Sequence, residues 1–258
     1  MSWIRFALLA WTLLSAAGVS AQSVRVVDVP SRPGVNQRIL LITPDAPKAV
    51  AILFAGGVGD INIADDGRLE KGGNFLVRSR EFFAEQGFIV AVFDKPSDRA
   101  DLNNFRQTAG HVADVKAVMA WLRSQTKLPI WLVGTSRGTQ SAAFVAEQLK
   151  DDAQAPDGLV LTSTMLKDDR DTPVTDLEMD KLKLPVLVVH HEQDGCKHCL
   201  YSDIPKLMDK LIASQRKQLF SFTGGVSTGN VCGARAYHGF NGIERSVVDK
   251  IAAWILNP

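Results

Sequence analysis

Ser136 lies at the centre of the motif with the clearest chemical meaning, Gly-Thr-Ser-Arg-Gly at 134–138. An apolar run at 129–133 precedes the motif and a helical pattern over 139–149 follows it, which predicts a sharp turn between a strand and a helix. The glycines two residues before and after the serine let strand and helix approach closely. A serine held at such a turn can act as a nucleophile, because the first N–H groups of the helix lie beside the reacting carbon and stabilise a developing oxyanion.

Two later segments contain groups that could activate this serine. Asp194 follows the apolar run at 185–189, and His238 lies in a loop before the last helical pattern. An imidazole at the site would take the proton of the serine hydroxyl and later give it to the leaving group. A carboxylate beside the imidazole would orient the ring and stabilise its charged form.

The acid has alternatives in the sequence. Glu192 is two residues from Asp194, and Asp168 and Asp169 follow the preceding predicted strand. We favour Asp194, because an Asp directly before Gly195 suits the turn that is expected after a strand.

The elements that must position these groups alternate along the chain after a start rich in strands. Strands are predicted at 24–29, 37–43, 49–54, 88–93, 129–133, 158–161, 185–190 and 218–222, and helices at 74–86, 110–124, 139–149, 204–214 and 242–256. The strands are apolar on both faces, which is typical of the α/β class, with a mostly parallel central sheet and helices on both faces. Sites in such sheets form at the carboxyl ends of the strands, where Ser136 and Asp194 are expected.

The chain order of Ser136, Asp194 and His238 resembles that of the α/β-hydrolase superfamily, and the resemblance covers essentially all of the mature sequence. The chain is most similar to small exported bacterial members that have the Gly-Thr-Ser-Arg-Gly turn and a late His-Gly-Phe, which stands here at 238–240. The resemblance implies the α/β-hydrolase fold, with Ser136 as the nucleophile, Asp194 as the acid and His238 as the base.

The same resemblance implies an oxyanion hole made by two backbone N–H groups. One would belong to Arg137 and the other to the glycine-rich loop at 54–59. Ala55 stands where many lipases have a histidine before their glycines, so the second donor would be Gly57 or Val58.

The expected function is a serine hydrolase that cleaves an ester or related acyl bond of a small substrate through an acyl-enzyme on Ser136, with no cofactor and no metal. The segment between 161 and 185 is short and polar, so no large lid is expected and small soluble acyl substrates are favoured. The superfamily includes esterases, thioesterases, dienelactone hydrolases, peptidases and some non-hydrolases, and the motif does not choose among them. Two alternatives remain: a non-catalytic binding protein on the same fold, and a metal or thiol-redox protein that uses 190–199.

The first 21 residues are typical of a secretory signal peptide. Arg5 is their only charge, 6–14 is apolar, and Val-Ser-Ala at 19–21 suits cleavage after residue 21. An uncleaved membrane anchor is the alternative, but the apolar stretch is short for a span. We therefore expect an exported protein, periplasmic or secreted, whose residues 22–258 form a single domain without stable membrane insertion.

The three cysteines are expected to include one disulfide, because export leads to an oxidising compartment. Cys196 is close to Asp194 in the sequence, and Cys232 is close to His238. If acid and base meet, these cysteines meet as well, so Cys196–Cys232 is the expected bond, with Cys199–Cys232 as the alternative. The Cys-Lys-His-Cys motif at 196–199 also permits a zinc or redox interpretation, with His190, His191 and His198 as further ligands.

Composition narrows the choice of partners. The chain has 258 residues, is 46% hydrophobic and has a net charge of +1 with no basic or acidic block. Nothing in it indicates a nucleic-acid partner, and a small-molecule acyl substrate is the partner that the motifs imply. The oligomeric state stays open.

Overall fold

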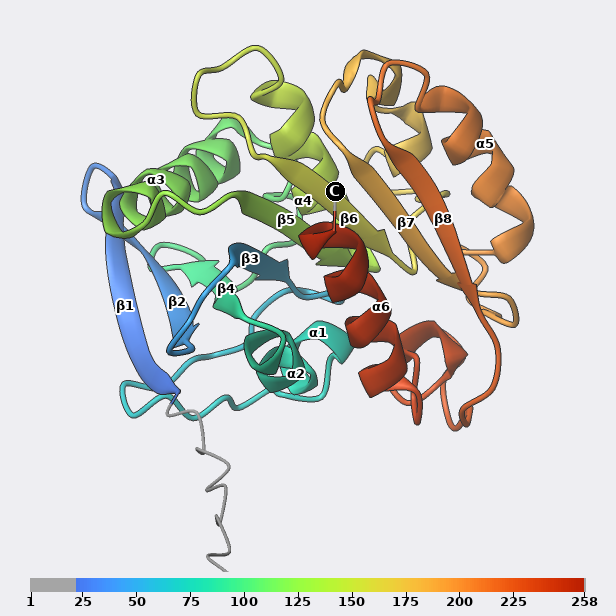
Figure 1. The fold of residues 1–258 in the computed structure, drawn as a ribbon, viewed down its shortest axis with the longest axis horizontal. Coiled ribbons are helices and arrows are strands. Elements are labelled where there is room, and N and C mark those ends of the chain that lie inside the picture. The colour runs from blue at the N-terminus through green and yellow to red at the C-terminus, as the bar shows by residue number, and fades with distance from the viewer. Residues whose placement is uncertain (1–21, 258) are drawn as a thin grey trace, which may run out of the picture.

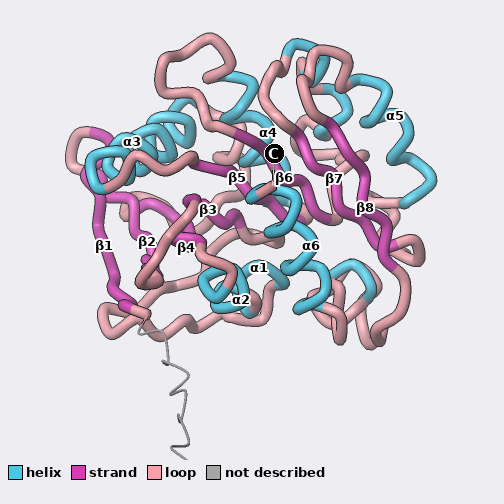
Figure 2. The backbone as a smooth tube through the Cα atoms, in the orientation of Figure 1, coloured by secondary structure: helices cyan, strands magenta, loops and turns pink. Residues whose placement is uncertain are grey.

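The structure is a computed structural model that describes residues 22–257, so the signal peptide expected at 1–21 lies outside the described residues. Its centre is an eight-stranded sheet with the strand order β1-β2-β4-β3-β5-β6-β7-β8. Figure 2 shows the strands as one sheet that runs from β1 at the left to β8 at the right. The pairs β1–β2 and β2–β4 are antiparallel, and every later pair in the order is parallel.

The strands agree closely with the expected ranges. They are β1 (Ser23–Arg32), β2 (Val35–Thr43), β3 (Ala49–Phe54), β4 (Phe88–Pro96), β5 (Ile130–Thr135), β6 (Gly158–Thr162), β7 (Val186–His191) and β8 (Lys217–Phe222). The α-helices are α1 (Phe75–Arg78), α2 (Arg80–Glu85), α3 (Ala109–Gln125), α4 (Arg137–Gln148), α5 (Ile204–Lys210) and α6 (Glu244–Leu256). Figure 1 shows how these helices lie around the sheet.

The sheet packs against its helices through two apolar cores, one on each face. On β3, Val50 and Ile52 point into a core with buried side chains of α3, α4 and α5, whereas Ala51 and Leu53 point into a second core with α1, α2 and α6. This alternation follows from the two-residue period of a strand, and it explains why the central strands are apolar on both faces. The expected α/β fold with helices on both faces is confirmed.

Two predicted helices differ in extent from the structure. The helix predicted at 74–86 is divided at Ser79, which ends α1 and directly precedes α2. The helix predicted at 204–214 ends at Lys210. There the backbone turns so that Leu211 is fully buried in the core while Ile212 stays 74% exposed, and burial of the leucine outweighs continuation of the helix.

The connection between β6 and β7 carries two single-turn 3₁₀ helices, Val174–Asp176 and Met179–Lys181, and no large lid is present in residues 22–257. Within the same residues, no helix has both the length and the hydropathy that a bilayer span requires. The carboxyl ends of β3, β5, β6 and β7 therefore lie at an edge that only loops and short turns surround.

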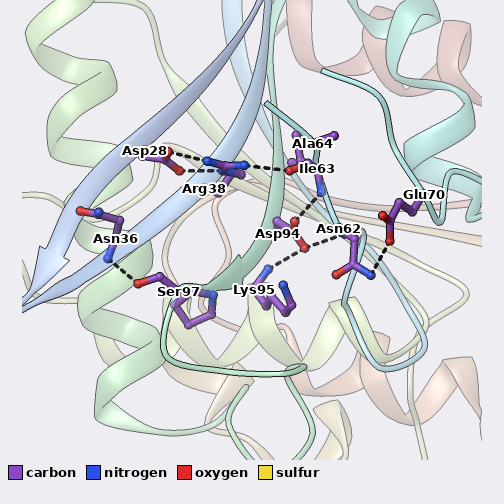
Figure 3. Close-up of a pocket in the computed structure, with 11 residues that line it drawn as sticks. Asp28, Asn36, Arg38, Asn62, Ile63, Ala64, Glu70, Asp94, Lys95 and Ser97 are labelled. Atoms are coloured by element: carbon purple, nitrogen blue, oxygen red, sulfur yellow. Dashed lines mark hydrogen bonds and ion pairs between the residues drawn. The ribbon is translucent and has the colours of Figure 1, made fainter. Parts of the chain in front are cut away.

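The loop at 56–73 is held by a buried carboxylate at the end of β4. Asp94 accepts hydrogen bonds from the N–H groups of Ile61 and Ile63 at 2.9 and 2.8 Å. Figure 3 shows it beside a cavity of about 500 Å³, across which Arg38 binds both Asp28 and the Ile63 carbonyl. The contacts of Asp94 and Arg38 thus hold the loop at 61–63 against β2 and β4.

Candidate active site

Ser136 occupies the turn that the motif predicts, between the end of β5 and the start of α4. Its backbone has φ 52° and ψ −128°, an unusual conformation for a residue with a side chain. Its N–H donates to the Thr162 carbonyl at 3.0 Å, and its carbonyl accepts from the Thr139 hydroxyl at 2.6 Å. The neighbouring strand and the helix together hold the strained turn, which brings the serine to the carboxyl edge of the sheet.

The two glycines of the motif are required by close backbone contacts. A Cβ placed on Gly134 would lie 2.5 Å from the Gly138 carbonyl oxygen. A Cβ placed on Gly138 would lie 2.0 Å from the Phe54 carbonyl oxygen. Helix α4 can therefore approach both β5 and β3 only because these positions have no side chain.

Gly138→Ala is expected to lower the free energy of unfolding by about 3 kcal/mol, because the clash is with backbone that cannot turn away. Urea denaturation measures the loss. Gly73→Ala is the matched control, since a Cβ there meets no atom within 4 Å. Equal unfolding midpoints for the two variants would contradict this account of the motif.

Asp194 and His238 come together beyond the end of β7. The His238 Nδ1 and Asp194 Oδ2 atoms are 2.8 Å apart, and both side chains are buried. A carboxylate accepts, so Nδ1 carries the proton and the lone pair of the imidazole is at Nε2. The second carboxylate oxygen, Oδ1, accepts from the Cys196 N–H at 2.9 Å. The Asp194 carboxylate is thus fixed at both oxygens, and it selects the tautomer in which Nε2 is unprotonated, as a general base would require.

The His238 Nε2 atom is buried and has no hydrogen-bond partner among the described residues. The Ser136 hydroxyl does not bind it in this structure; its recorded contact is with the Met165 sulfur at 4.0 Å. The hydroxyl of Ser163, the residue after β6, donates to the His238 carbonyl at 2.7 Å, which attaches the histidine loop to the strand beside β5. Serine–histidine hydrogen bonds are often long in ligand-free sites, so this arrangement suits a base that engages the serine when substrate arrives.

The rival acids are placed elsewhere. Asp168 binds Arg137, with 2.9 Å between Oδ2 and Nη2, and also accepts from Gln140. Burial is the largest single influence and opposes its ionisation, but hydrogen bonds from Arg137, the Arg170 N–H and Gln140, with the charge of Arg137, together lower the pKa of Asp168. Glu192 and Asp169 are exposed. Arg137 thus makes a structural ion pair through its side chain, and its backbone N–H is free of acceptors among the described residues.

The paired histidines at the end of β7 bind loops and are fully buried. The His190 Nε2 donates to the Cys199 carbonyl at 2.6 Å and lies 3.6 Å from Asp194 Oδ2. Burial lowers the pKa of His190, which favours its neutral form. His191 stacks on Tyr237 with 4.5 Å between ring centroids, and its Nε2 is 2.9 Å from the Gly224 carbonyl. Both histidines therefore contact the loops that contain Asp194 and His238.

The glycine-rich loop after β3 lies against the serine. A Cβ placed on Gly56 would be 2.9 Å from the Ser136 Cβ and 3.3 Å from the Asn74 amide nitrogen. The N–H groups of Gly57 and Val58 have no acceptor among the described residues. A cavity of about 380 Å³ follows the loop and is lined by 55–61, Lys71, Gly73, Asn74 and Ala234. The loop thus lies against Ser136 at Gly56, lines this cavity, and has backbone N–H groups without an acceptor at Gly57 and Val58.

A disulfide joins Cys196 to Cys232, with 4.6 Å between their Cα atoms, and Cys199 is a buried free thiol. This is the expected pairing, and it links the loop that contains Asp194 to the loop that contains His238. The Cys196 N–H also donates to the Asp194 carboxylate, so one cysteine of the disulfide directly contacts this side chain.

Loss of the disulfide, by Cys232→Ala or by a dithiol reductant, is expected to lower the free energy of unfolding by about 3–4 kcal/mol, because it releases a loop with a sequence separation of 36. Activity should fall at denaturant concentrations that leave the protein folded, since acid and base lose their shared anchor. Urea denaturation and assay of the same samples measure both effects. Reductant should not change the unfolding midpoint of Cys232→Ala. If reductant also leaves the unfolding midpoint of the wild type unchanged, the prediction is wrong.

The structure gives little support to a metal or redox role for 190–199. Ligand atoms of Cys196, Cys199 and His238 lie within 4.8 Å of one another, but Cys196 is in the disulfide and His238 is bound to Asp194. Burial raises the pKa of the Cys199 thiol well above its usual range, whereas reactive cysteines have lowered values.

Sequence reasoning missed several residues around the serine. Met165 contacts the hydroxyl, Asn74 lies beside Gly56, and Arg106 binds the carbonyls of the glycine-rich loop. Asn74 does carry a sequence signal, as an Asn directly before a helical pattern, and its side-chain oxygen caps α1 by accepting from the Leu76 N–H. The other two lie in loops without a periodic pattern.

Comparison with solved structures shows the same fold. A cold-adapted esterase from an Arctic intertidal metagenomic library aligns with a TM-score of 0.59 and 16% identity, over 95% of this chain and 99% of that one. An esterase of Pyrococcus furiosus aligns with a TM-score of 0.61 and 12% identity, over 90% of both chains. A dienelactone hydrolase of Anabaena variabilis gives 0.61 and 14%, over 91% and 97%. No protein-family model and no curated protein matches the sequence. The chain therefore has the α/β-hydrolase fold.

Proposed function

We propose that this protein is a serine hydrolase that cleaves an ester or related acyl bond of a small substrate. The observation that carries the proposal is the Asp194–His238 hydrogen bond, which leaves a buried and unpartnered Nε2 at the sheet edge where Ser136 occupies its strained turn. The fold is shared with esterases and a dienelactone hydrolase, which is consistent with this activity.

In the proposed reaction His238 Nε2 takes the proton of the Ser136 hydroxyl as its oxygen attacks the substrate carbonyl carbon. The negative charge that develops on the carbonyl oxygen is stabilised by the N–H of Arg137 and by Gly57 or Val58. The histidine then gives its proton to the leaving group, and an acyl-enzyme on Ser136 remains. Water, activated by the same nitrogen, hydrolyses that intermediate, while Asp194 keeps the ring oriented throughout.

The cavity beside the glycine-rich loop supports a small, uncharged acyl group. Its loop wall consists mainly of glycine, alanine, valine and isoleucine, and its charged residues Lys71 and Asp60 form an ion pair with each other. A volume of about 380 Å³ and the absence of a large lid in 22–257 favour short acyl chains over long lipids.

We further propose that residues 22–258 form the mature domain and act in the periplasm or outside the cell, after cleavage of a signal peptide at residue 21. The Cys196–Cys232 disulfide supports an oxidising compartment. The proposed partner is the acyl substrate itself, with no nucleic acid and no stable membrane insertion.

A fluorophosphonate probe tests the proposal, because it labels only an activated serine. We expect stoichiometric labelling at Ser136, located by peptide mapping, and hydrolysis of p-nitrophenyl esters that is fastest for acetate and butyrate and slow for laurate. Absence of both labelling and turnover would favour the non-catalytic binding protein. Preference for laurate would retain the chemistry and reject the small-acyl assignment.

A further inference from the structure

We propose that Arg106 is a positioning residue for the oxyanion hole, which holds the glycine-rich loop and helix α4 at a fixed spacing so that their N–H groups converge on one oxygen. This inference rests on the proposed function, since it assigns a role within the reaction at Ser136. Nothing in the motif at 134–138 points to it, because Arg106 lies in the loop before α3.

The guanidinium of Arg106 binds both walls of the proposed hole. Its Nη2 donates to the Ala55 and Gly57 carbonyls at 3.1 and 3.2 Å, and its Nη1 donates to the Ser141 hydroxyl on α4 at 2.8 Å. One planar group thus connects the loop after β3 to the helix that begins at Arg137, the two segments that carry the proposed donors.

The contacts fix the direction of the loop's donors. In a trans peptide the C=O and N–H bonds point in opposite directions. The Gly57 carbonyl points at Arg106, so the N–H of the same peptide, which belongs to Val58, points away from it; the Ala55 carbonyl fixes the Gly56 N–H in the same way. The same loop lies against Ser136 at Gly56 and lines the cavity of about 380 Å³. This selects Val58 over Gly57 as the loop donor that Arg106 holds.

The charge of Arg106 strengthens the same donors. A cation on a peptide carbonyl polarises the peptide, which makes its N–H a better hydrogen-bond donor. Arg106 is 3% exposed, and no carboxylate lies within ion-pair distance of it in 22–257. Burial and nearby Arg137 lower the pKa of Arg106, whereas Asp171 and Asp101 raise it, and the guanidinium stays charged at neutral pH. Neither carboxylate is within ion-pair distance, so the groups that bind this buried cation directly are two loop carbonyls and a hydroxyl of α4.

The glycine-rich loop packs closely against the guanidinium at Gly59. A Cβ placed on Gly59 would be 2.5 Å from the Arg106 Nη2 and 2.8 Å from the Leu102 Cδ1. The loop therefore lies directly on the cation, which spans from the loop to the Ser141 hydroxyl of α4.

Arg106→Gln and Arg106→Lys test whether Arg106 contributes to stabilisation of the transition state. We expect Arg106→Gln to lower kcat on p-nitrophenyl acetate about 100-fold, with KM changed less than threefold, because a misplaced donor matters only once the oxyanion forms. Affinity for a trifluoromethyl ketone, which forms an oxyanion adduct with the serine, should fall by the same factor as kcat/KM. Arg106→Lys keeps the charge but cannot span three acceptors, so a loss of about tenfold in both measures is expected.

Arg123→Gln is the matched control. Arg123 also donates to two backbone carbonyls, those of Gln154 and Ala155, but near the amino ends of β5 and β6, away from the site. It should change neither kcat nor ketone affinity, whatever it does to the thermal midpoint. This separates a positioning role from loss of stability alone.

The outcomes distinguish the two proposals. A wild type that the fluorophosphonate probe does not label overturns the proposed function and this inference with it. A labelled, active wild type whose folded Arg106→Gln variant keeps kcat and ketone affinity overturns the inference alone, as does a variant that loses kcat but binds the ketone normally. If Arg106→Gln does not fold, Arg106→Lys decides by the same two measurements.

Discussion

Ser136→Ala is expected to abolish ester hydrolysis, with a loss of kcat of about 10⁶-fold at most, because only binding and the oxyanion donors remain to act. The fold should persist, since the hydroxyl contributes no hydrogen bond to the described structure beyond its 4.0 Å contact with Met165. Removal of fluorophosphonate labelling should accompany the loss. The initial rate of p-nitrophenyl acetate hydrolysis and circular dichroism measure the two properties on the same sample.

Ser124→Ala is the control for this variant, because Ser124 is an exposed serine near the end of α3 whose hydroxyl binds only local backbone and Gln125. It should keep full activity and labelling. If Ser136→Ala retains turnover above about 1% of wild type, Ser136 is not the nucleophile and the proposed function is wrong.

The fold and the positions of Ser136 and Asp194 could be predicted, because the sequence patterns that indicate them are local. Each central strand is a short apolar run, and in a parallel sheet the carboxyl ends of such runs meet at one edge, so Ser136 and Asp194 could be placed without knowing the strand order. The disulfide followed from the same convergence, because Cys196 and Cys232 are close in sequence to residues that must meet. These inferences required only the order of the residues in the chain and the predicted ends of the strands.

The residues that hold the site in place could not be predicted in this way. They act through contacts between segments that are far apart in the sequence, and those segments show no periodic pattern. Arg106 reaches Gly57 and Ser141 from a loop whose conformation no pattern specifies. The early end of α5 depends on where Leu211 finds the core, which is a property of the packed structure and not of the local sequence. The sequence predicts the candidate catalytic residues, whereas their contacts with Arg106 and with the neighbouring loops come from the structure alone.

Asp194→Asn is expected to lower kcat about 10⁴-fold, through the tautomer of the histidine. The Cys196 N–H requires an acceptor at the position of Oδ1, so the amide oxygen of the Asn should stay there and its NH₂ should face His238. Nδ1 must then accept, which moves the ring proton to Nε2, and a protonated Nε2 cannot take the proton of Ser136. The pH–rate profile and kcat on p-nitrophenyl acetate measure the effect.

Asp168→Asn is the matched control, because Asp168 is the rival acid and is bound to Arg137 instead of His238. We expect it to lower kcat by less than about tenfold, through a small shift of the first turn of α4 rather than through the histidine. The reverse pattern, with Asp168→Asn severe and Asp194→Asn mild, would place the acid in the connection that follows β6. Equal and mild effects would mean that His238 acts without a carboxylate, and the 2.8 Å hydrogen bond between Asp194 and His238 would then serve only to hold the two loops together.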